Sequence, residues 1–291
     1  MTEERKIILI TGTSRGIGKA TAEHLKAKGY IVYGSSRNID DAGDRHLQLE
    51  VTDPASCQAA VDLVVEREGR LDVLVNNVAH HLVGAHEETS LDEIHEQFDV
   101  NFFGAVNMIK AATPYMLHRR SGAIVNMISV PGEIGFPFMA AYSASKFALN
   151  GYAESLRMEL VPFGITVSNI SPAGVKTGTT DQSVRKPAAS HPLFADASSS
   201  IFEKTRGGQE KGESSVKDVA SAIERAISSN KPLLRYRVGV LPRMLLTLRT
   251  LLSQRRLERF VMKAIGAPTK PPASTPTPSA KPTETHHANA S

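Results

Sequence analysis

Short runs of apolar, often β-branched residues alternate in this chain with longer segments in which apolar residues recur every three or four positions. The short runs predict strands, and several are apolar throughout, as expected for a parallel sheet covered on both faces. The longer segments predict amphipathic helices. The predicted strands span residues 6–11, 31–35, 46–50, 73–76, 123–128 and 165–171, and the predicted helices span residues 16–28, 55–68, 91–119 and 142–160.

The alternation of strand and helix predicts an α/β fold, with a doubly wound parallel sheet of the Rossmann type and about seven strands. Local signals support the helix limits. Asp53 and Pro54 form a favourable helix start, and Gly29 and Gly164 lie where helices are expected to end. We therefore expect a single domain over residues 1–240.

The alternation is interrupted between residues 178 and 215. This stretch is rich in Ser, Gly, Asp and Lys, and it carries two apolar islands at residues 191–194 and 201–202. A flexible surface loop is one interpretation, but the apolar islands favour a lid or substrate-binding insertion. A predicted helix over residues 216–228 and a short apolar strand near residues 236–240 follow.

A basic segment over residues 241–266 comes next, and its leucine spacing predicts one amphipathic helix. Such a helix could lie on a membrane surface, which would make the protein a peripheral membrane protein. Packing over the substrate site or on a partner subunit is the interpretation that we favour. The last stretch, residues 267–291, is rich in Pro, Thr and Ser and nearly lacks large apolar residues, so it is predicted to be disordered.

Composition sets limits on compartment and partners. The 291 residues are 41% hydrophobic, which suits one large globular domain. The net charge of +4 is spread without a long basic run, so nucleic acid is not indicated as a partner. Cys57 is the single cysteine and is interpreted as structural, which fits a reducing, cytoplasmic location. We expect no signal peptide, and no apolar run reaches the roughly 18 residues of a spanning helix.

A glycine-rich turn joins the first predicted strand to the first predicted helix. Its G-x-x-x-G-x-G spacing permits a tight turn and lets a pyrophosphate approach the backbone, while the helix N-terminus supplies N–H groups. Glycines alone are a weak signal, but the strand–turn–helix context favours a dinucleotide site over an ordinary turn. The predicted binding residues of this turn are Gly12, Thr13, Ser14, Arg15, Gly16, Ile17 and Gly18.

The end of the second strand bears on which dinucleotide binds. An NAD site usually places Asp or Glu there, about 20 residues after the glycines, on the ribose hydroxyls. This strand ends instead at Ser36 and Arg37. Arg37, joined by Arg15 and Ser36, can bind a 2′-phosphate, which predicts NADP(H). Asp40 and Asp41 lie slightly further on and keep NAD as the alternative, as does a purely solvated role for either arginine.

Tyr142 and Lys146 are four residues apart and therefore share one face of a predicted helix. A free tyrosine titrates near roughly 10, and a nearby ammonium group stabilises the phenolate and lowers that pKa toward neutral pH. Lys146 can also hydrogen-bond a nicotinamide ribose. This spacing is common by chance, so an ordinary pair on a helix surface is the alternative.

Two further residues favour the catalytic interpretation. Ser129 follows the preceding strand, where strand ends face the ligand crevice, and its hydroxyl can donate to a substrate oxygen as negative charge develops. Asn101 lies inside a predicted helix. A buried amide there needs partners, and a water relay to Lys146 would provide them. A capping or exposed asparagine is the alternative.

The order and spacing of these residues resemble the short-chain dehydrogenase/reductase family in its single-domain form, from about residue 6 to residue 240. Asn76-Asn77 after the fourth strand and residues 172–177 match as well. The resemblance implies an oxidoreductase in which Asn77, Val175 and Thr177 contact the cofactor, the last two at the nicotinamide amide.

The resemblance also assigns catalytic roles. Tyr142 is implied to be the general acid/base, and Lys146 to tune it and hold the ribose. Ser129 is implied to orient the substrate carbonyl, and Asn101 to continue a proton relay. The implied reaction is reversible hydride transfer between NADP(H) and a carbonyl or secondary alcohol, and it requires no metal.

One stretch departs from the family pattern. The usual Asn-Asn-Ala-Gly reads Asn-Asn-Val-Ala at residues 76–79, followed by His80 and His81. Ala79 resists the positive φ that glycine allows, which puts the backbone geometry beside the cofactor in question. The two histidines could reach the substrate, but ordinary polar loop residues are the favoured interpretation because no third metal ligand is spaced for them.

Substrate, assembly and a rival function complete the expectations. The C-terminal pattern resembles family members that act on lipophilic substrates, such as hydroxysteroid- and retinol-type dehydrogenases, with a polyketide-like or other aliphatic ketone as the alternative. Family members commonly pair through helices 91–119 and 142–160, so a homodimer or homotetramer is expected. The rival function is a catalytically idle NADP(H)-binding regulator or scaffold. The presence of all four catalytic residues argues against it.

Overall fold

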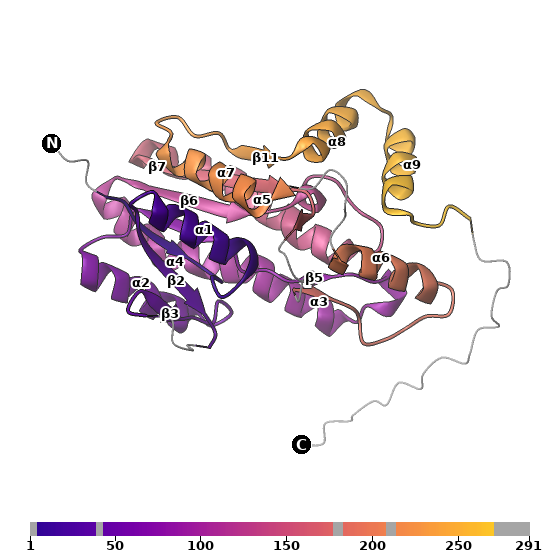
Figure 1. Cartoon of the computed structure of the whole chain (residues 1–291), viewed down its shortest axis with the longest axis horizontal. Coiled ribbons are helices and arrows are strands. Elements are labelled where there is room, and N and C mark those ends of the chain that lie inside the picture. Colours follow the sequence, from indigo (N-terminus) through magenta and orange to yellow (C-terminus); the bar gives the residue numbers. More distant parts are fainter. Residues whose placement is uncertain (1–4, 39–42, 177–182, 208–213, 271–291) are drawn as a thin grey trace, which may run out of the picture.

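The centre of the molecule is a seven-stranded sheet in which each neighbouring pair of strands is parallel. The computed structural model describes residues 5–38, 43–176, 183–207 and 214–270. The predicted doubly wound parallel sheet is confirmed (Figure 1). The strands, in their order across the sheet, are β11 (Arg235–Val238), β7 (Ile165–Pro172), β6 (Gly122–Met127), β4 (Val73–Asn76), β1 (Ile7–Ile10), β2 (Ile31–Ser36) and β3 (His46–Gln48).

Helices cover both faces of this sheet. One layer contains α1 and α7, and the opposite layer contains α2, α4 and α5 (Figure 1). Two-residue strands add two small sheets, β5 (His81–Leu82) with β9 (Val184–Arg185) and β8 (Val175–Lys176) with β10 (Ser214–Ser215). The helices are α1 (Gly16–Ala27), α2 (Pro54–Glu68), α3 (Leu91–Phe98), α4 (Gly104–Arg119), α5 (Ala140–Leu160), α6 (Ala195–Gly207), α7 (Val216–Ser228), α8 (Val240–Leu251) and α9 (Gln254–Ile265).

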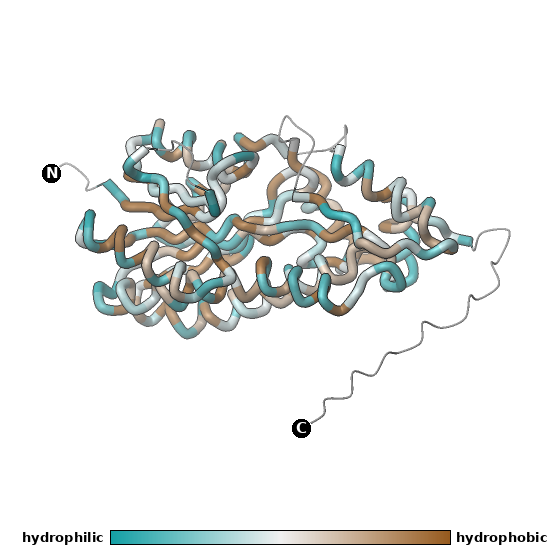
Figure 2. The backbone as a smooth tube through the Cα atoms, turned by 90° about the horizontal axis from the view of Figure 1, so that it is seen from below, coloured by the Kyte–Doolittle hydropathy of each residue, from teal (hydrophilic) through white to brown (hydrophobic). Residues whose placement is uncertain are grey.

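Strand β1 illustrates why both faces must be covered. All of its residues are buried, and successive side chains point to opposite faces. Ile7 and Leu9 join the core beneath α2, α4 and α5, whereas Ile8 and Ile10 join the core beneath α1 and α7. Figure 2 shows hydrophobic positions concentrated in the strands through the middle of the molecule. An apolar strand without alternation therefore marks a sheet between two helix layers.

The helix predicted over residues 91–119 is divided. Helix α3 leads into a π-helical turn at Asp99–Phe103, and α4 begins at Gly104. A wider turn changes the direction in which side chains point, and Asn101 is buried within it. Gly104 fits because a Cβ there would lie 2.7 Å from Val51 Cγ2. Packing against Val51, which the helical periodicity does not reveal, sets this boundary.

The single helix predicted over residues 241–266 is wrong, because the chain forms two helices there. Leu252 and Ser253 have extended backbone angles and separate α8 from α9. Each helix buries its own apolar stripe, with Leu245 and Leu246 in α8 and Val261 among the buried residues of α9. All three pack in one small core, and a single straight helix could not reach around it with both stripes.

The predicted lid region contains β9, α6 and β10, while residues 177–182 and 208–213 lie outside the described residues. Its apolar islands pack inward. Ile201 shares a small core with Met139 and Tyr142, and the ring of Phe194 lies 6.4 Å from that of Phe138, centre to centre. The lid function stays a prediction. Of the tail predicted to be disordered, residues 271–291 also lie outside the described residues.

Candidate active site

A cavity of about 1080 Å³ lies at the carboxyl ends of the central strands. The glycine turn after β1 lines one side, and the first turns of α5 line the other. Residues from α8, α9 and the end of α6 also contribute to its wall. Carboxyl ends of strands are where open parallel sheets bind ligands. The fold therefore brings most of the predicted cofactor residues to one place, together with Ser129, Tyr142 and Lys146.

The glycine turn has a backbone that larger residues would disturb. Gly12 and Gly16 have positive φ angles of 72° and 57°. A Cβ on Gly18 would lie only 2.1 Å from the Gly12 carbonyl oxygen. Helix α1 begins here with Arg15 at its N-cap, and the Arg15 side chain does not cap the first N–H groups of the helix. These donors and the bare glycine backbone fit the phosphates of a dinucleotide.

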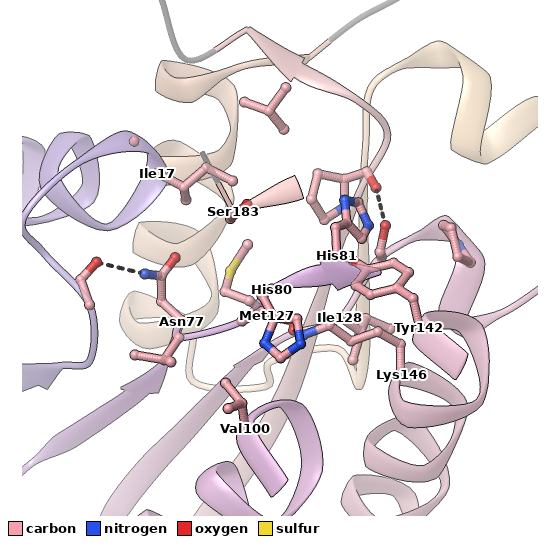
Figure 3. Close-up of a pocket in the computed structure, with 18 of the residues that line it drawn as sticks. Ile17, Asn77, His80, His81, Val100, Met127, Ile128, Tyr142, Lys146 and Ser183 are labelled. Atoms are coloured by element: carbon pink, nitrogen blue, oxygen red, sulfur yellow. Dashed lines mark hydrogen bonds between the residues drawn. The ribbon is translucent and has the colours of Figure 1, made fainter. Parts of the chain in front are cut away.

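Thr11 is a residue that the sequence analysis left out of the site. It is buried, and its hydroxyl accepts hydrogen bonds from the backbone N–H groups of Asn77 (2.9 Å) and Val78 (3.1 Å). The Asn77 side chain in turn donates to the carbonyl oxygens of Thr11 and Gly12, and Figure 3 marks one of these bonds with a dashed line. Asn77 lines the cavity, and its amide holds the glycine turn in shape. A threonine directly after an apolar strand was the available signal.

Some of the other predicted cofactor residues line the cavity and some do not. Ser14, Ile17 and Val175 line the cavity. Thr13 does not line it, because the Thr13 side chain is buried and its backbone N–H donates to Ser35 at 2.8 Å. Thr177 lies outside the described residues.

The two cationic side chains of the predicted 2′-phosphate site both lie at the cavity. Arg15 and Arg37 are exposed side chains that line it, together with Ser36. The Ser36 hydroxyl contacts His46 Nε2 at 2.7 Å, which fixes the end of β2. Two guanidinium groups suit an additional phosphate. Asp40 and Asp41, which bear on the NAD alternative, lie outside the described residues.

Tyr142 and Lys146 project into the cavity from successive turns of α5 (Figure 3). The Lys146 Nζ lies 5.9 Å from the centre of the Tyr142 ring. Both side chains are buried, and Lys146 Nζ donates to the Met127 carbonyl oxygen at the end of β6 (2.8 Å). Burial lowers the pKa of Lys146 to about 7, because the interior disfavours an ammonium ion. The pair is therefore interior and close to the cavity, not an ordinary helix-surface pair.

Ser129 lines the same cavity just beyond the end of β6. Its hydroxyl contacts the Pro172 carbonyl oxygen at a long distance of 3.5 Å, so the bond is weak. Ser129 also precedes a short turn over Val130–Gly132 that packs on α5. A Cβ on Gly132 would come within 2.9 Å of Lys146 Cβ. The serine and the lysine are thus positioned by a close approach of two backbones.

A row of buried asparagines supports this turn, and the sequence analysis missed it. Asn76, Asn126 and Asn169 occupy neighbouring positions in β4, β6 and β7 and are joined by side-chain hydrogen bonds of 2.9 and 3.2 Å. Asn169 donates to Asn150 of α5, which donates to the Gly132 carbonyl oxygen. An asparagine in each of three apolar strands was a readable signal of a polar network.

Asn101 is buried, but its side chain has other partners than the predicted relay. Its amide oxygen accepts from the His80 N–H, and its Nδ2 donates to the His80 carbonyl oxygen, both at 2.9 Å. Nδ2 also lies 3.2 Å from the Ser145 hydroxyl. The contacts among described residues therefore give Asn101 a role in holding the loop after β4. A relay through Asn101 to Lys146 stays a prediction.

The two histidines after β4 are cavity residues and not exposed loop residues. His80 is buried, and burial, aided by the charge of Arg185, lowers its pKa to about 4. It is therefore neutral at physiological pH. The His81 ring packs edge-on against Tyr142, with ring centres 3.5 Å apart (Figure 3). The favoured interpretation of both as ordinary loop residues does not hold.

The departure at Ala79 causes no backbone strain. In the described part of the chain, positive φ angles outside glycine occur at Arg120 and Phe138 and not at Ala79. Alanine therefore fits this loop, and the geometry beside the glycine turn is set instead by Thr11 and Asn77.

Cys57 plays no part in the candidate active site. It is buried in α2, and burial raises its pKa to about 12, which keeps the thiol protonated.

No described helix combines the length and apolarity needed to cross a membrane. No group of three or more His, Cys, Asp or Glu side chains within the described ranges could hold a metal ion.

Known proteins resemble this chain in both sequence and fold. Over residues 6–188 the chain matches the short chain dehydrogenase family. It is 39% identical over 246 residues to a 3-ketodihydrosphingosine reductase of Bacteroides thetaiotaomicron, covering 82% of this chain and 90% of that protein. It is 34% identical over 276 residues to retinol dehydrogenase 8 of Homo sapiens, covering 86% of each.

A solved structure, ElxO with NADP bound, superposes with a TM-score of 0.66 at 26% identity and covers 81% of this chain and 97% of its own. The sheet order, the glycine turn and the Tyr142–Lys146 pair had already indicated the same group of proteins. The chain belongs to the short-chain dehydrogenase/reductase family of oxidoreductases.

Proposed function

We propose that this protein is an NADP(H)-dependent oxidoreductase that transfers a hydride reversibly between the nicotinamide and a carbonyl or secondary alcohol of a lipophilic substrate. One observation carries the proposal: Tyr142, Lys146 and Ser129 line the same cavity as the glycine turn. A phenol, a cation and a hydroxyl are the groups needed to bind and protonate a carbonyl oxygen beside a dinucleotide.

The chain's own residues act on the oxygen and the proton. Ser129 donates a hydrogen bond to the carbonyl oxygen and orients it. Tyr142 donates a second hydrogen bond and then its proton, so that an alcohol forms. Lys146 stabilises the phenolate that remains, since its ammonium group lies near the Tyr142 ring. When bound, the cofactor supplies the hydride that this proton transfer accompanies.

The preference for NADP(H) over NAD(H) is part of the proposal. Arg15 and Arg37 at the cavity offer two guanidinium groups to a 2′-phosphate. The NADP-bound state of the neighbour ElxO supports the same choice. Replacing Arg37 by Ala is expected to raise the KM for NADPH about tenfold or more and to leave that for NADH nearly unchanged.

A lipophilic substrate is supported by the part of the cavity beyond Tyr142. Its wall there is apolar and comes from distant segments, namely Phe136, Met139, Leu241, Leu245 and Ile265. Two relatives are named for a sphingoid ketone and for retinol, both lipophilic. An apolar wall favours such substrates because burying it together with the ligand removes both from water.

The proposal extends to the partners of the protein and to its location in the cell. Besides the small-molecule substrate, we propose a homodimer or homotetramer and a peripheral membrane contact through the C-terminal segment. The proposed cytoplasmic location rests on the single cysteine, Cys57, which is buried and has no cysteine partner.

The test is a carbonyl panel followed by NADPH absorbance, with NADH in parallel. The panel contains short and long aliphatic ketones, a steroid ketone and retinal. Tyr142→Phe is expected to reduce kcat by roughly 100-fold to 10,000-fold and to leave NADPH binding, measured by fluorescence, intact. The matched control is Tyr115→Phe, which removes the hydroxyl of a half-buried tyrosine that donates to Asp62 and should retain activity.

The rival function predicts a different outcome. If the wild type binds NADPH but reduces no member of the panel, and Tyr142→Phe retains the biological output, the protein is an idle regulator or scaffold. Faster turnover with NADH than with NADPH would contradict the cofactor preference alone.

A further inference from the structure

The outer face of α8 exposes large apolar side chains. Val240, Met244 and Leu251 are 77%, 42% and 74% exposed. At about 100° per residue they fall within roughly 40° of one another around the helix, so they form one stripe. Pro242, Leu245 and Leu246 are buried on the opposite side. This helix is therefore apolar on two faces, and the described residues cover one of them.

Helix α9 exposes a different chemistry. Arg255, Arg256, Arg259 and Lys263 are all exposed, and they lie on the face opposite to its buried apolar stripe. None of these four cations forms an ion pair with a carboxylate among the described residues. Their charges are thus available to an external anion.

This cationic character is local. The segment from Val240 to Ile265 carries six Arg and Lys residues and one acidic residue, Glu258, which gives it a net charge of +5. The whole chain has a net charge of +4, so the rest of the molecule sums to −1. A positive potential is therefore concentrated at the end of the molecule formed by α8 and α9, beyond the sheet (Figure 1).

The same two helices also form part of the cavity wall. Leu241 and Leu245 of α8 and Ile265 of α9 line the candidate active site. Only Leu252 and Ser253 separate the two helices, and both helices turn their buried side chains toward the same small core, so their exposed faces point away from that core. A surface that binds α8 and α9 from outside would lie next to the apolar part of the cavity.

We propose that α8 and α9 dock on an anionic lipid bilayer. The exposed stripe of α8 inserts at the boundary between headgroups and acyl chains, while the four cations of α9 contact anionic headgroups. An exposed apolar stripe beside unpaired cations matches the two components of such a surface. Insofar as it delivers a bilayer-dissolved substrate to the cavity, the docking rests on the proposed function. Membrane binding itself does not depend on turnover.

The experiment is flotation of the full-length protein with vesicles of phosphatidylcholine alone and of phosphatidylcholine with about one-third phosphatidylglycerol. The wild type is expected to bind the anionic vesicles about tenfold more strongly than the neutral ones, and high salt should weaken this binding. Neutralising α9 with R255Q/R256Q/R259Q/K263Q should abolish the preference. Replacing the α8 stripe with V240S/L251S should reduce binding to anionic vesicles severalfold.

Matched variants control for total charge and apolarity. K26Q/K110Q/K217Q/R225Q removes four exposed cations from other helices, and L91S removes an apolar side chain that is equally exposed on α3. Both controls should bind as the wild type does. Circular dichroism and the melting temperature establish that each variant is folded.

Two results would overturn the docking proposal. One is equal recovery of wild type with anionic vesicles and without vesicles. The other is a lower molecular mass of V240S/L251S in sedimentation velocity, which would make the stripe a contact between copies of the chain. Tyr142→Phe separates this proposal from the enzymatic one, because it should float like the wild type. Flotation without any carbonyl reduction would refute only the proposed reaction.

Discussion

Lys146 carries an ammonium group into the interior beside Tyr142, where its one described hydrogen bond goes to a backbone carbonyl. Burial lowers its pKa from 10.5 to about 7. Between these two values the unfolded chain binds a proton that the folded chain does not, so the contribution of Lys146 to stability rises with pH. Below about pH 7 Lys146 is protonated in both the folded and the unfolded chain, and the full free-energy cost of burying its ammonium group remains.

The first prediction concerns Lys146→Met in the cofactor-free protein. The variant should exceed the wild type in free energy of unfolding by the largest amount below about pH 7. This difference should shrink by a few kcal/mol as the pH approaches about 10. Urea unfolding at several pH values measures it. Lys110→Met, at an exposed lysine of α4, is the control for the loss of a lysine from a helix. A pH-independent difference for Lys146→Met would refute the perturbed lysine. The rate of carbonyl reduction by Lys146→Met should also fall by roughly 100-fold or more.

A second prediction at this scale concerns His81. Its ring packs against Tyr142, so it fills space beside the phenol at which we propose the substrate binds. His81→Gly should increase kcat/KM for bulky ketones relative to acetone-sized ones by about tenfold, since the opened space admits larger groups. The readout is the ratio between substrates, which a general loss of stability would not shift. An unchanged ratio would show that substrates do not approach past His81.

Single residues were predictable from sequence where local spacing fixes their geometry. Tyr142 and Lys146 share a face of one helix, and the structure places both in the cavity. His81 was misjudged because its contact with Tyr142 depends on the pairing of β5 with β9, which joins segments about a hundred residues apart in the chain. Nothing in the local sequence encodes that pairing.

At the scale of elements, Glu133 joins α8 and β11 to the turn after Ser129. Its buried carboxylate accepts two hydrogen bonds from Arg237 of β11, at 2.9 and 3.2 Å. Arg249 of α8 donates to the Glu133 carbonyl oxygen. The C-terminal elements are therefore tied to the backbone that carries Ser129, the proposed catalytic serine.

This tie yields a third prediction. Glu133→Ala leaves Arg237 without its carboxylate and should lower the free energy of unfolding by about 1–3 kcal/mol. It should also lower kcat severalfold with little change in the KM for NADPH, because Ser129 is displaced and the glycine turn is not. Glu154→Ala removes an exposed partner of Arg235 and is the control. Equal effects of the two substitutions would refute a special role for Glu133.

Element boundaries were the least predictable part of the fold. Helix α7 has the bounds expected from its periodicity, Val216–Ser228, because Ser215 caps its start locally. The π-helical turn before α4 and the break between α8 and α9 were not predicted. In both places the periodicity continues, and the direction of the chain changes to fit a distant surface.

For the whole molecule, a further exposed apolar surface bears on assembly. Phe147 and Met158 of α5 are 38% and 70% exposed, and they lie on one face of that helix. This surface is distinct from the α8 stripe. It is the face through which we propose that α5 pairs with a second copy.

The fourth prediction is that Met158→Asp lowers the molecular mass of the protein in sedimentation velocity to that of a monomer. A carboxylate at the centre of an apolar contact lacks a partner and is costly to bury. Leu251→Asp, at an equally exposed position of α8, should leave the mass unchanged. A monomeric wild type would refute the assembly.

The alternation of apolar strands with amphipathic helices was sufficient to specify a doubly wound sheet, since each strand's own side chains require cover on both faces. Spacing within one turn or helix likewise specified the glycine turn and the Tyr142–Lys146 pair. Contacts between remote segments required the folded chain: the Thr11–Asn77 clamp, the asparagine row, the position of His81 and the two-sided surface of α8. Local periodicity records which face of an element is apolar, and only packing determines what that face meets.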